Sequence, residues 1–154
     1  MTYAEAIRNG TANFNTTATL IEGTCVDGNL DSYTTIQSSS SGTYADVTGT
    51  SRTVTVNTGD SVLLIADYSW SAGTLGESLG VSWIEDGSAI GTTTQEYGVV
   101  ADTSGNRQRG SLIYLRTAPT AGSRTYKLKF ARAAGSGTVY LKNINVMVFV
   151  FQNR

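Results

Sequence analysis

Hydrophobic and polar positions alternate most clearly in the last third of the chain. Residues 123–132 place Tyr126, Leu128 and Phe130 on one side of an extended strand and polar side chains on the other. A period of two is typical of a strand with one buried face and one wet face. A turn of small residues, 133–137, separates this strand from a second one, so the pattern predicts a β-hairpin.

The second strand of this hairpin breaks the alternation at residues 146–151. Valines occupy its even positions, and Met147, Phe149 and Phe151 occupy its odd positions, so both faces favour burial. One sandwich core covers only one face, and we expect another subunit to cover the other. The alternative is a strand inside a single domain with loops over its back. The residues predicted to form the subunit interface are Val146, Val148, Val150, Phe149 and Phe151.

Short apolar runs bounded by turn residues recur from Tyr44 to Phe151 and predict about eight strands. The Asp86-Gly87 pair is a strong hairpin signal, because both residues tolerate a positive φ. Trp83 falls on the apolar side of its strand and is expected in the core. Many short strands at regular spacing are the signature of a single all-β sandwich domain.

Residues 1–42 are polar and precede the region of regular strands, so we expect an N-terminal arm ahead of a domain at residues 43–154. Residues 2–5 fit a helix capping box, which predicts a short helical turn over residues 4–9. A weak strand is expected around residues 18–26. Such an arm is either flexible or laid on a partner. The arm residues predicted to contact a partner are Tyr3, Ile7, Arg8 and Phe14.

The formal net charge of −1 conceals an uneven distribution. All twelve acidic groups lie in residues 1–102 with two basic ones, whereas residues 103–154 hold nine basic groups and no acid. Either the basic strands meet an anionic surface or an acidic neighbouring subunit, or the strands interleave and the signs mix on one sandwich. Nucleic acid is not an expected partner, because domains that bind it usually carry a basic surplus.

No apolar run is long enough to span a membrane, and residues 1–5 lack the basic start and apolar block of a secretion signal. We therefore expect no membrane partner and synthesis in a cytoplasm. The single cysteine, Cys25, cannot form a disulfide within the chain and is expected to be a small buried hydrophobe.

The chain contains no histidine, which removes Ser-His-Asp and Cys-His catalysis and the usual zinc sites. Residues 27–31 begin like a calcium loop, but Ser38 stands where such a loop needs a glutamate. We expect no catalytic residues, no cofactor and no metal, and hence no enzyme.

Exposed aromatic side chains would permit a ligand-binding role. Trp70 ends its strand beside a glycine-rich loop, where it could offer a stacking platform for a sugar. The alternative is that these aromatics belong to the core and the sheet edges. The residues predicted to bind a ligand in this case are Trp70, Tyr68, Arg107 and Arg109.

Residues 122–128, Gly-Ser-Arg-Thr-Tyr-Lys-Leu, follow Ala118-Pro119 and precede a Gly-Ser-Gly hairpin and an apolar closing strand. From Tyr44 to Phe151 the chain resembles the tumour-necrosis-factor-like jelly-roll domains of bacteriophage capsid-decoration and fibre-head proteins. The pattern marks a strand and its turn, not a chemistry.

The resemblance implies a two-sheet antiparallel jelly roll that forms a homotrimer, with the last strand near the threefold axis. It also implies a virion protein on the capsid surface, made in the host cytoplasm, whose N-terminal arm ties it to the major capsid protein. The alternative function is a receptor-binding fibre or spike head that binds carbohydrate or a cell surface.

Overall fold

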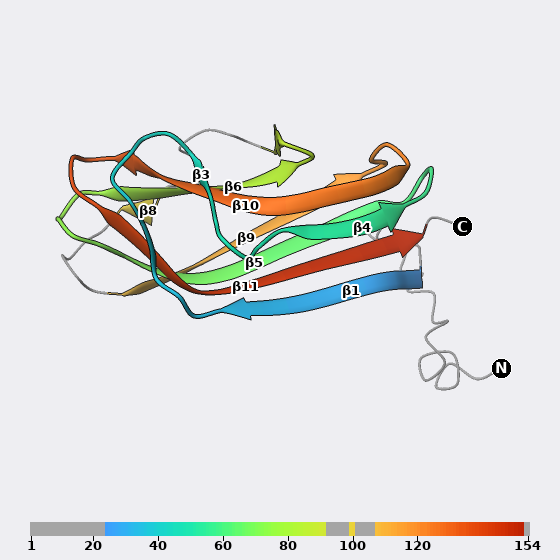
Figure 1. Ribbon diagram of the computed structural model, residues 1–154, viewed down its shortest axis with the longest axis horizontal. Helices are drawn as coiled ribbons and strands as arrows, with labels where there is room; N and C mark the ends of the chain where they lie inside the picture. The colour runs from blue at the N-terminus through green and yellow to red at the C-terminus, as the bar shows by residue number, and fades with distance from the viewer. Residues whose placement is uncertain (1–23, 92–98, 101–106, 153–154) are drawn as a thin grey trace, which may run out of the picture.

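The protein folds as a sandwich of two antiparallel β-sheets (Figure 1). A computed structural model describes residues 24–91, 99–100 and 107–152. Within these ranges every regular element is a strand, and there are eleven, several of only two or three residues. The structure confirms the expected all-β jelly-roll sandwich, with more and shorter strands than the eight that the sequence predicts.

Sheet A is built on β11, which pairs with β1 and β2 along one side and with β5 along the other. β5 pairs in turn with β9. All of these pairs are antiparallel. The strands of sheet A are β1 (Thr24–Tyr33), β2 (Gln37–Ser39), β5 (Ser61–Ala72), β9 (Gln108–Thr117) and β11 (Val139–Gln152).

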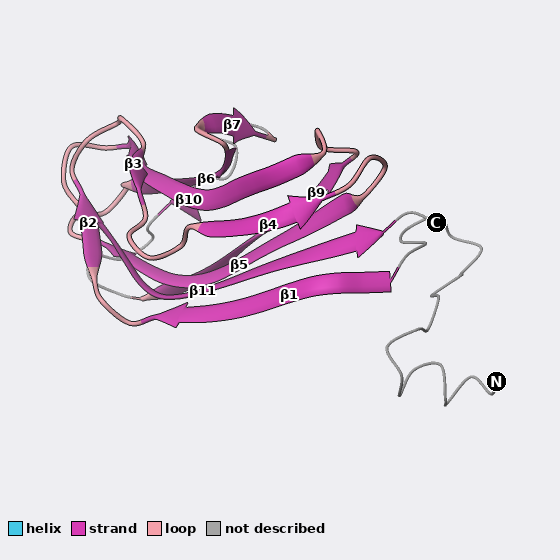
Figure 2. Ribbon diagram, turned by 45° about the vertical axis from the view of Figure 1, so that its right-hand side comes forward, coloured by secondary structure: helices cyan, strands magenta, loops and turns pink. Residues whose placement is uncertain are grey.

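Sheet B is built on β10, which pairs with β6 on one side and with β3 and β4 on the other. β6 also pairs with β7 and β8. Figure 2 shows β3 and β4 along β10, with β5, β11 and β1 forming the layer beneath. The strands of sheet B are β3 (Ala45–Asp46), β4 (Arg52–Val56), β6 (Ser78–Glu85), β7 (Ser88–Ile90), β8 (Val99–Val100) and β10 (Gly122–Ala134).

The core lies between the sheets and follows the alternation of β5. Its even positions, from Val62 to Ala72, are at most 3% exposed, while its odd positions are half-buried on the outer side. Trp83 enters the core from sheet B, and its indole nitrogen donates a hydrogen bond to the carbonyl of Leu112 in sheet A. The prediction that Trp83 points inward is confirmed.

A β-bulge at Asn143 lets β11 keep its apolar residues inward along its whole length. Val139 and Leu141 are buried before the bulge, whereas Ile144 and Val146 are buried after it, so the inward parity changes from odd to even. The register with β5 slips at this point, and Asn143 has a φ of +50°, which asparagine tolerates better than most residues. One extra residue on a strand is what exchanges its two faces.

The predicted hairpin at Asp86-Gly87 is present between β6 and β7, with φ values of +47° and +89° at the two turn residues. The Asp86 carboxylate also ties this turn to β10. It accepts hydrogen bonds from the backbone N–H of Thr125, at 2.8 Å, and from the Arg124 guanidinium, at 2.7 Å. The Thr125 amide, and then Arg124, lower the pKa of Asp86 below its usual value of 3.8.

The predicted boundary between arm and domain at residue 42 is wrong. β1 runs beside β11 from Thr24, and β2 extends the same edge as far as Ser39, so most of residues 24–42 belong to sheet A. The polar composition of this segment concealed a strand whose partner lies more than a hundred residues away in sequence. The expected helical turn at residues 4–9, the expected strand start at residue 18 and the arm residues Tyr3, Ile7, Arg8 and Phe14 lie outside the described residues.

We expect Val148→Asp to prevent folding, whereas Phe149→Asp leaves the fold intact. Val148 has no exposed surface, and a charge buried there without a partner costs roughly 3–5 kcal/mol, a large part of a typical domain's stability of about 5–15 kcal/mol. Phe149 points outward. Circular dichroism and thermal melts of the two purified variants check this, and equal loss of structure in both would contradict the assignment of faces.

We expect Asp86→Asn to reduce stability at neutral pH but to have little effect in acid. Asparagine keeps the turn, so the variant removes mainly the charge. Because folding lowers the pKa of Asp86, its stabilising contribution is present above pH 3.8 and is lost as the pH falls through the folded-state value. Urea unfolding from pH 7 to pH 3 should show the difference between the two proteins shrinking, and a constant difference would contradict the prediction.

Candidate functional site

One face of sheet A points away from the core, and strand register sorts this outer face into rows. Residues paired across antiparallel strands point to the same side. Ile65 of β5 pairs with Ile113 of β9 and Met147 of β11, and the next row repeats this apolar arrangement. We define the apolar patch as Leu63, Ile65, Ile113, Leu115, Met147, Phe149 and Phe151.

The apolar patch is partly accessible and spans β11, β5 and β9 at one end of the outer face. Most of its side chains are half-buried by their neighbours, while Ile113, on β9, is 63% exposed. Three strands about 4.8 Å apart, with same-face rows about 6.8 Å apart, give it an area of roughly 250 Å². A stable interface buries about 800 Å² per partner, so the patch is large enough to be the centre of an interface, not the whole of it.

The structure corrects part of the predicted interface. Val146, Val148 and Val150 are fully buried in the core of the single chain and cannot contact another subunit. Phe149 and Phe151 lie on the outer face and stay available for such a contact. The sequence pattern showed two apolar faces but did not indicate which one faced the opposite sheet.

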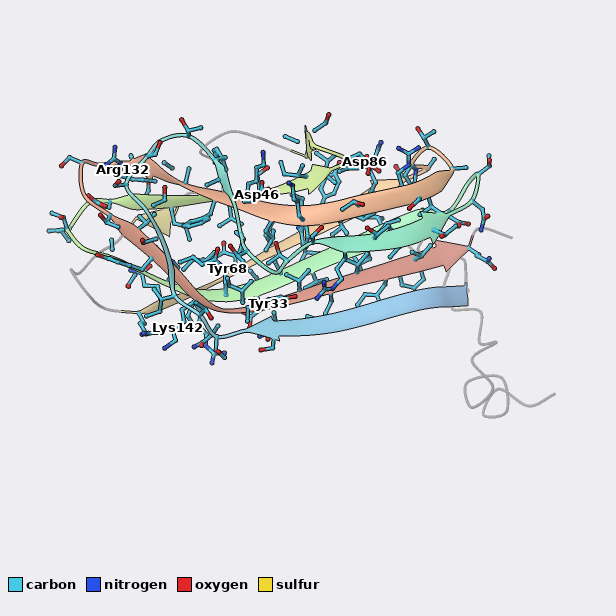
Figure 3. All side chains as sticks on the ribbon, viewed as in Figure 1. Tyr33, Asp46, Tyr68, Asp86, Arg132 and Lys142 are labelled. Carbon is cyan, nitrogen blue, oxygen red and sulfur yellow. The ribbon has the colours of Figure 1, made fainter. Side chains whose placement is uncertain are left out.

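A second, basic region lies at the other end of the same outer face. Beyond a polar row at Asp67, Ser69 pairs with Arg109 on β9 and with Lys142 on β11. In the last row, Tyr140 pairs with Ser71, the next outward residue of β5. Figure 3 shows Lys142 on the outer side of sheet A, while Tyr68 lies between the sheets. We define the basic end as Arg107, Arg109, Tyr140 and Lys142.

A shallow hollow of about 70 Å³ opens at the basic end. Its lining combines two cations, two aromatic side chains, two serines and an aliphatic side chain. Tyr140 is 37% exposed and Ile36 is 52% exposed, so both contribute accessible apolar surface. The lining residues are Ile36, Ser69, Trp70, Ser71, Arg107, Tyr140 and Lys142.

Within the described residues, the cations of the basic end differ from four others that form ion pairs, one on β9 and three on β10. Ion pairs join Arg116 to Glu85, Arg124 to Asp86, and both Lys127 and Lys129 to Asp46. Among the residues that the structure describes, Arg107, Arg109 and Lys142 form no ion pair. Three neighbouring cations that form no ion pair with a described residue, with one carboxylate, Asp67, a row away, leave a net positive potential that favours an anion.

Two of the four predicted ligand-binding residues prove to be core residues. Tyr68 and Trp70 are 3% and 1% exposed, because they share the inward parity of Val62 on β5. Burial, with a smaller contribution from Asp67, raises the pKa of Tyr68 to about 12. Trp70 lines the hollow but offers no exposed stacking platform. Arg107 and Arg109 are exposed, as a ligand site requires.

The sequence analysis missed Ile36, Tyr140 and Lys142. Tyr140 and Lys142 alternate with the buried Val139 and Leu141, and this outward position is readable from the sequence. Their proximity to Arg107 depends on the order of β11, β5 and β9 in the sheet, which the sequence does not reveal.

The described residues contain no group of three or more histidine, cysteine, aspartate or glutamate side chains that could hold a metal ion. Within the same residues, no helix has the length and apolar character needed to cross a membrane. The outer face of sheet A offers apolar contact at the apolar patch and positive charge at the basic end.

Comparisons with known proteins give a likeness of fold only. No family model and no curated protein matches the chain. A family 35 carbohydrate-binding module from Clostridium thermocellum matches 77% of this chain and 97% of its own length, with 10% identity and a TM-score of 0.43. The VP2 subviral particle of infectious bursal disease virus matches 82% of this chain and 33% of its own, with 14% identity and a TM-score of 0.47.

An insecticidal delta-endotoxin from Bacillus thuringiensis is similar over 72% of this chain at 12% identity, with a TM-score of 0.42. The matched region is 19% of the toxin's own length. At these identities and TM-scores the matches carry no argument about function.

We expect iodide to quench the tryptophan fluorescence of the native protein weakly. Trp70 and Trp83 are the two tryptophans of the chain, and each is 1% exposed. A charged quencher reaches exposed indoles but not indoles enclosed in a close-packed core. Unfolding in urea should restore quenching to the level of free tryptophan. Strong quenching before unfolding would contradict the inward position of Trp70.

Proposed function

We propose that this chain is a structural virion protein that assembles as a homotrimer on a phage capsid. It decorates the capsid surface and stabilises the shell by clamping subunits of the major capsid protein, and it is made in the host cytoplasm. The observation that carries the proposal is the apolar patch on the outer face of sheet A.

The apolar patch favours another copy of the chain as its cover. Burial is worth about 25 cal/mol per Å², so covering roughly 250 Å² contributes about 6 kcal/mol before the cost of association. The patch lies on the outer face of three paired strands, so a neighbour that covers it must pack face to face on the sheet. A flat apolar surface fits a rigid neighbour better than a flexible ligand, and two neighbouring copies in a trimer provide that surface.

The segment before β1 is the proposed capsid-binding element. Its candidate contacts are Tyr3, Ile7, Arg8 and Phe14. Three such segments on one trimer raise one another's effective concentration at the capsid, so a weak contact by each produces tight decoration. The two parts of the proposal therefore use different residues: the apolar patch for assembly and residues 1–23 for attachment.

We expect the wild-type chain to sediment as a trimer at micromolar concentration and the double variant Leu63→Ser/Phe149→Ser to sediment as a folded monomer. Both residues lie on the outer face, so the substitutions remove apolar contact without opening the core. Leu75→Ser is the matched control, because Leu75 is 63% exposed but lies outside the apolar patch. A wild-type monomer, or a trimer that survives the double variant, would overturn the assembly proposal.

Binding to empty capsids extends the same prediction to function. A chain lacking residues 1–20 should remain a trimer and lose capsid binding, whereas the monomeric double variant should bind much more weakly than wild type. If the truncated trimer decorates capsids as tightly as the full chain, the attachment proposal fails while the assembly proposal stands. If the truncated chain becomes monomeric, residues 1–20 of one copy cover the apolar patch of a neighbouring copy.

A second candidate function is the receptor-binding head of a fibre or spike. The hollow at the basic end favours it, since an accessible tyrosine beside cations that form no ion pair with a described residue suits an anionic ligand. The number of copies per particle separates the two functions: hundreds indicate decoration, and a few dozen or fewer indicate a fibre or spike.

A further inference from the structure

We propose that the basic end binds one acidic sugar unit of a surface polysaccharide. Arg107 and Lys142 would hold the anionic group, and Tyr140 would contact the ring. The inference deepens the receptor-binding function by naming its ligand, and it rests on that function and not on the trimer.

Charge supplies the first argument. Arg107 and Lys142 line one hollow, and Arg109 lies in the same row as Lys142. None of the three forms an ion pair with any residue that the structure describes, and β5 places its acidic residue, Asp67, one row away. An arginine fork and a lysine ammonium together form charge-assisted hydrogen bonds with a carboxylate or a sulfate.

The remaining lining supplies the second argument. A sugar ring has an apolar face of C–H groups and a rim of hydroxyls. Tyr140 and Ile36 provide accessible apolar surface, and Ser69 and Ser71 provide hydroxyls that both donate and accept. Binding pockets for small molecules commonly combine apolar walls with a few placed polar groups.

Size limits the ligand to a single unit. The hollow is shallow, with a volume of about 70 Å³ against about 300–1,000 Å³ for pockets that enclose a small molecule, so it can seat only part of one sugar unit. We therefore expect weak binding at each site, and several copies of the chain on one particle would supply avidity.

Other anionic partners fit the surface less well. Nucleic acid needs a longer run of cations that follows the phosphate backbone, and anionic lipid surfaces are usually bound by clusters of about 4–8 lysines and arginines. The basic end has three cations in a chain of net charge −1.

The basic end is also separate from the apolar patch. The row of Ser69 lies about 14 Å along the strand from the row of Ile65, at about 3.4 Å per residue. Substitutions in one region can therefore be tested without removing the other.

The test is calorimetric titration of the full chain with trigalacturonic acid, a carboxylated sugar, and with a heparin-derived disaccharide, a sulfated one. Maltotriose serves as the neutral control. We expect millimolar binding of at least one acidic sugar and none of maltotriose. Arg107→Gln/Lys142→Gln should weaken binding about tenfold or more, because hydrogen bonds to charged groups are lost. Tyr140→Ala should weaken it, and Tyr140→Phe should retain most of it.

Lys127→Gln/Lys129→Gln is the matched control, because it removes the same charge from sheet B and should leave the affinity within about twofold. If both double variants lose affinity equally, the effect comes from net charge alone, and the proposed site is overturned. Equal binding of a single-stranded DNA oligomer or of anionic lipid vesicles would overturn the assignment to sugar. Sedimentation of the same variants keeps the outcomes apart, since the basic-end variant should assemble like wild type.

Discussion

The fold depends on the antiparallel pairing of β11 with β5. This ladder joins the end of the chain to its middle, and β1, β2 and β9 attach to its two sides. β11 keeps apolar side chains in the core along its whole length only because the bulge at Asn143 exchanges its inward and outward faces. Without the extra residue, either Val139 and Leu141 or the three valines after the bulge would face solvent, and the core would lose one end.

Once the inner face is settled, the two outer faces of the sandwich differ in chemistry. Sheet B carries threonine and charged side chains tied to one another, as in the hydroxyl contact of Thr53 with Thr125 and the pairing of Lys127 with Asp46. Sheet A carries an apolar patch at one end and, at the other, cations that form no ion pair with a described residue. Covering the apolar patch, or placing an anion beside the cations, lowers the free energy of the system. Both proposed binding functions therefore use this sheet.

Whether a predicted site residue is exposed depends on which alternate positions of its strand face outward. Which residues become neighbours depends on the order of the strands in the sheet. Arg107 and Arg109 could be predicted because long cations in a polar stretch stay exposed. Tyr68 and Trp70 were placed wrongly because apolar residues occupy both parities of β5 between Val62 and Ile65, which hides the face that is inward. Tyr140 and Lys142 were missed because they become neighbours of Arg107 only through the register of three strands.

The sequence by itself determined the all-β class, the Asp86-Gly87 hairpin, the inward position of Trp83 and the presence of two apolar faces on the last strand. These properties depend on local alternation and turn chemistry, which act over a few residues. Tertiary structure alone decided which face of β11 is core, that β1 and β2 belong to the sheet, and that an apolar and a basic region share one surface. Each of these depends on pairing between distant segments, and a one-residue shift in register reverses it.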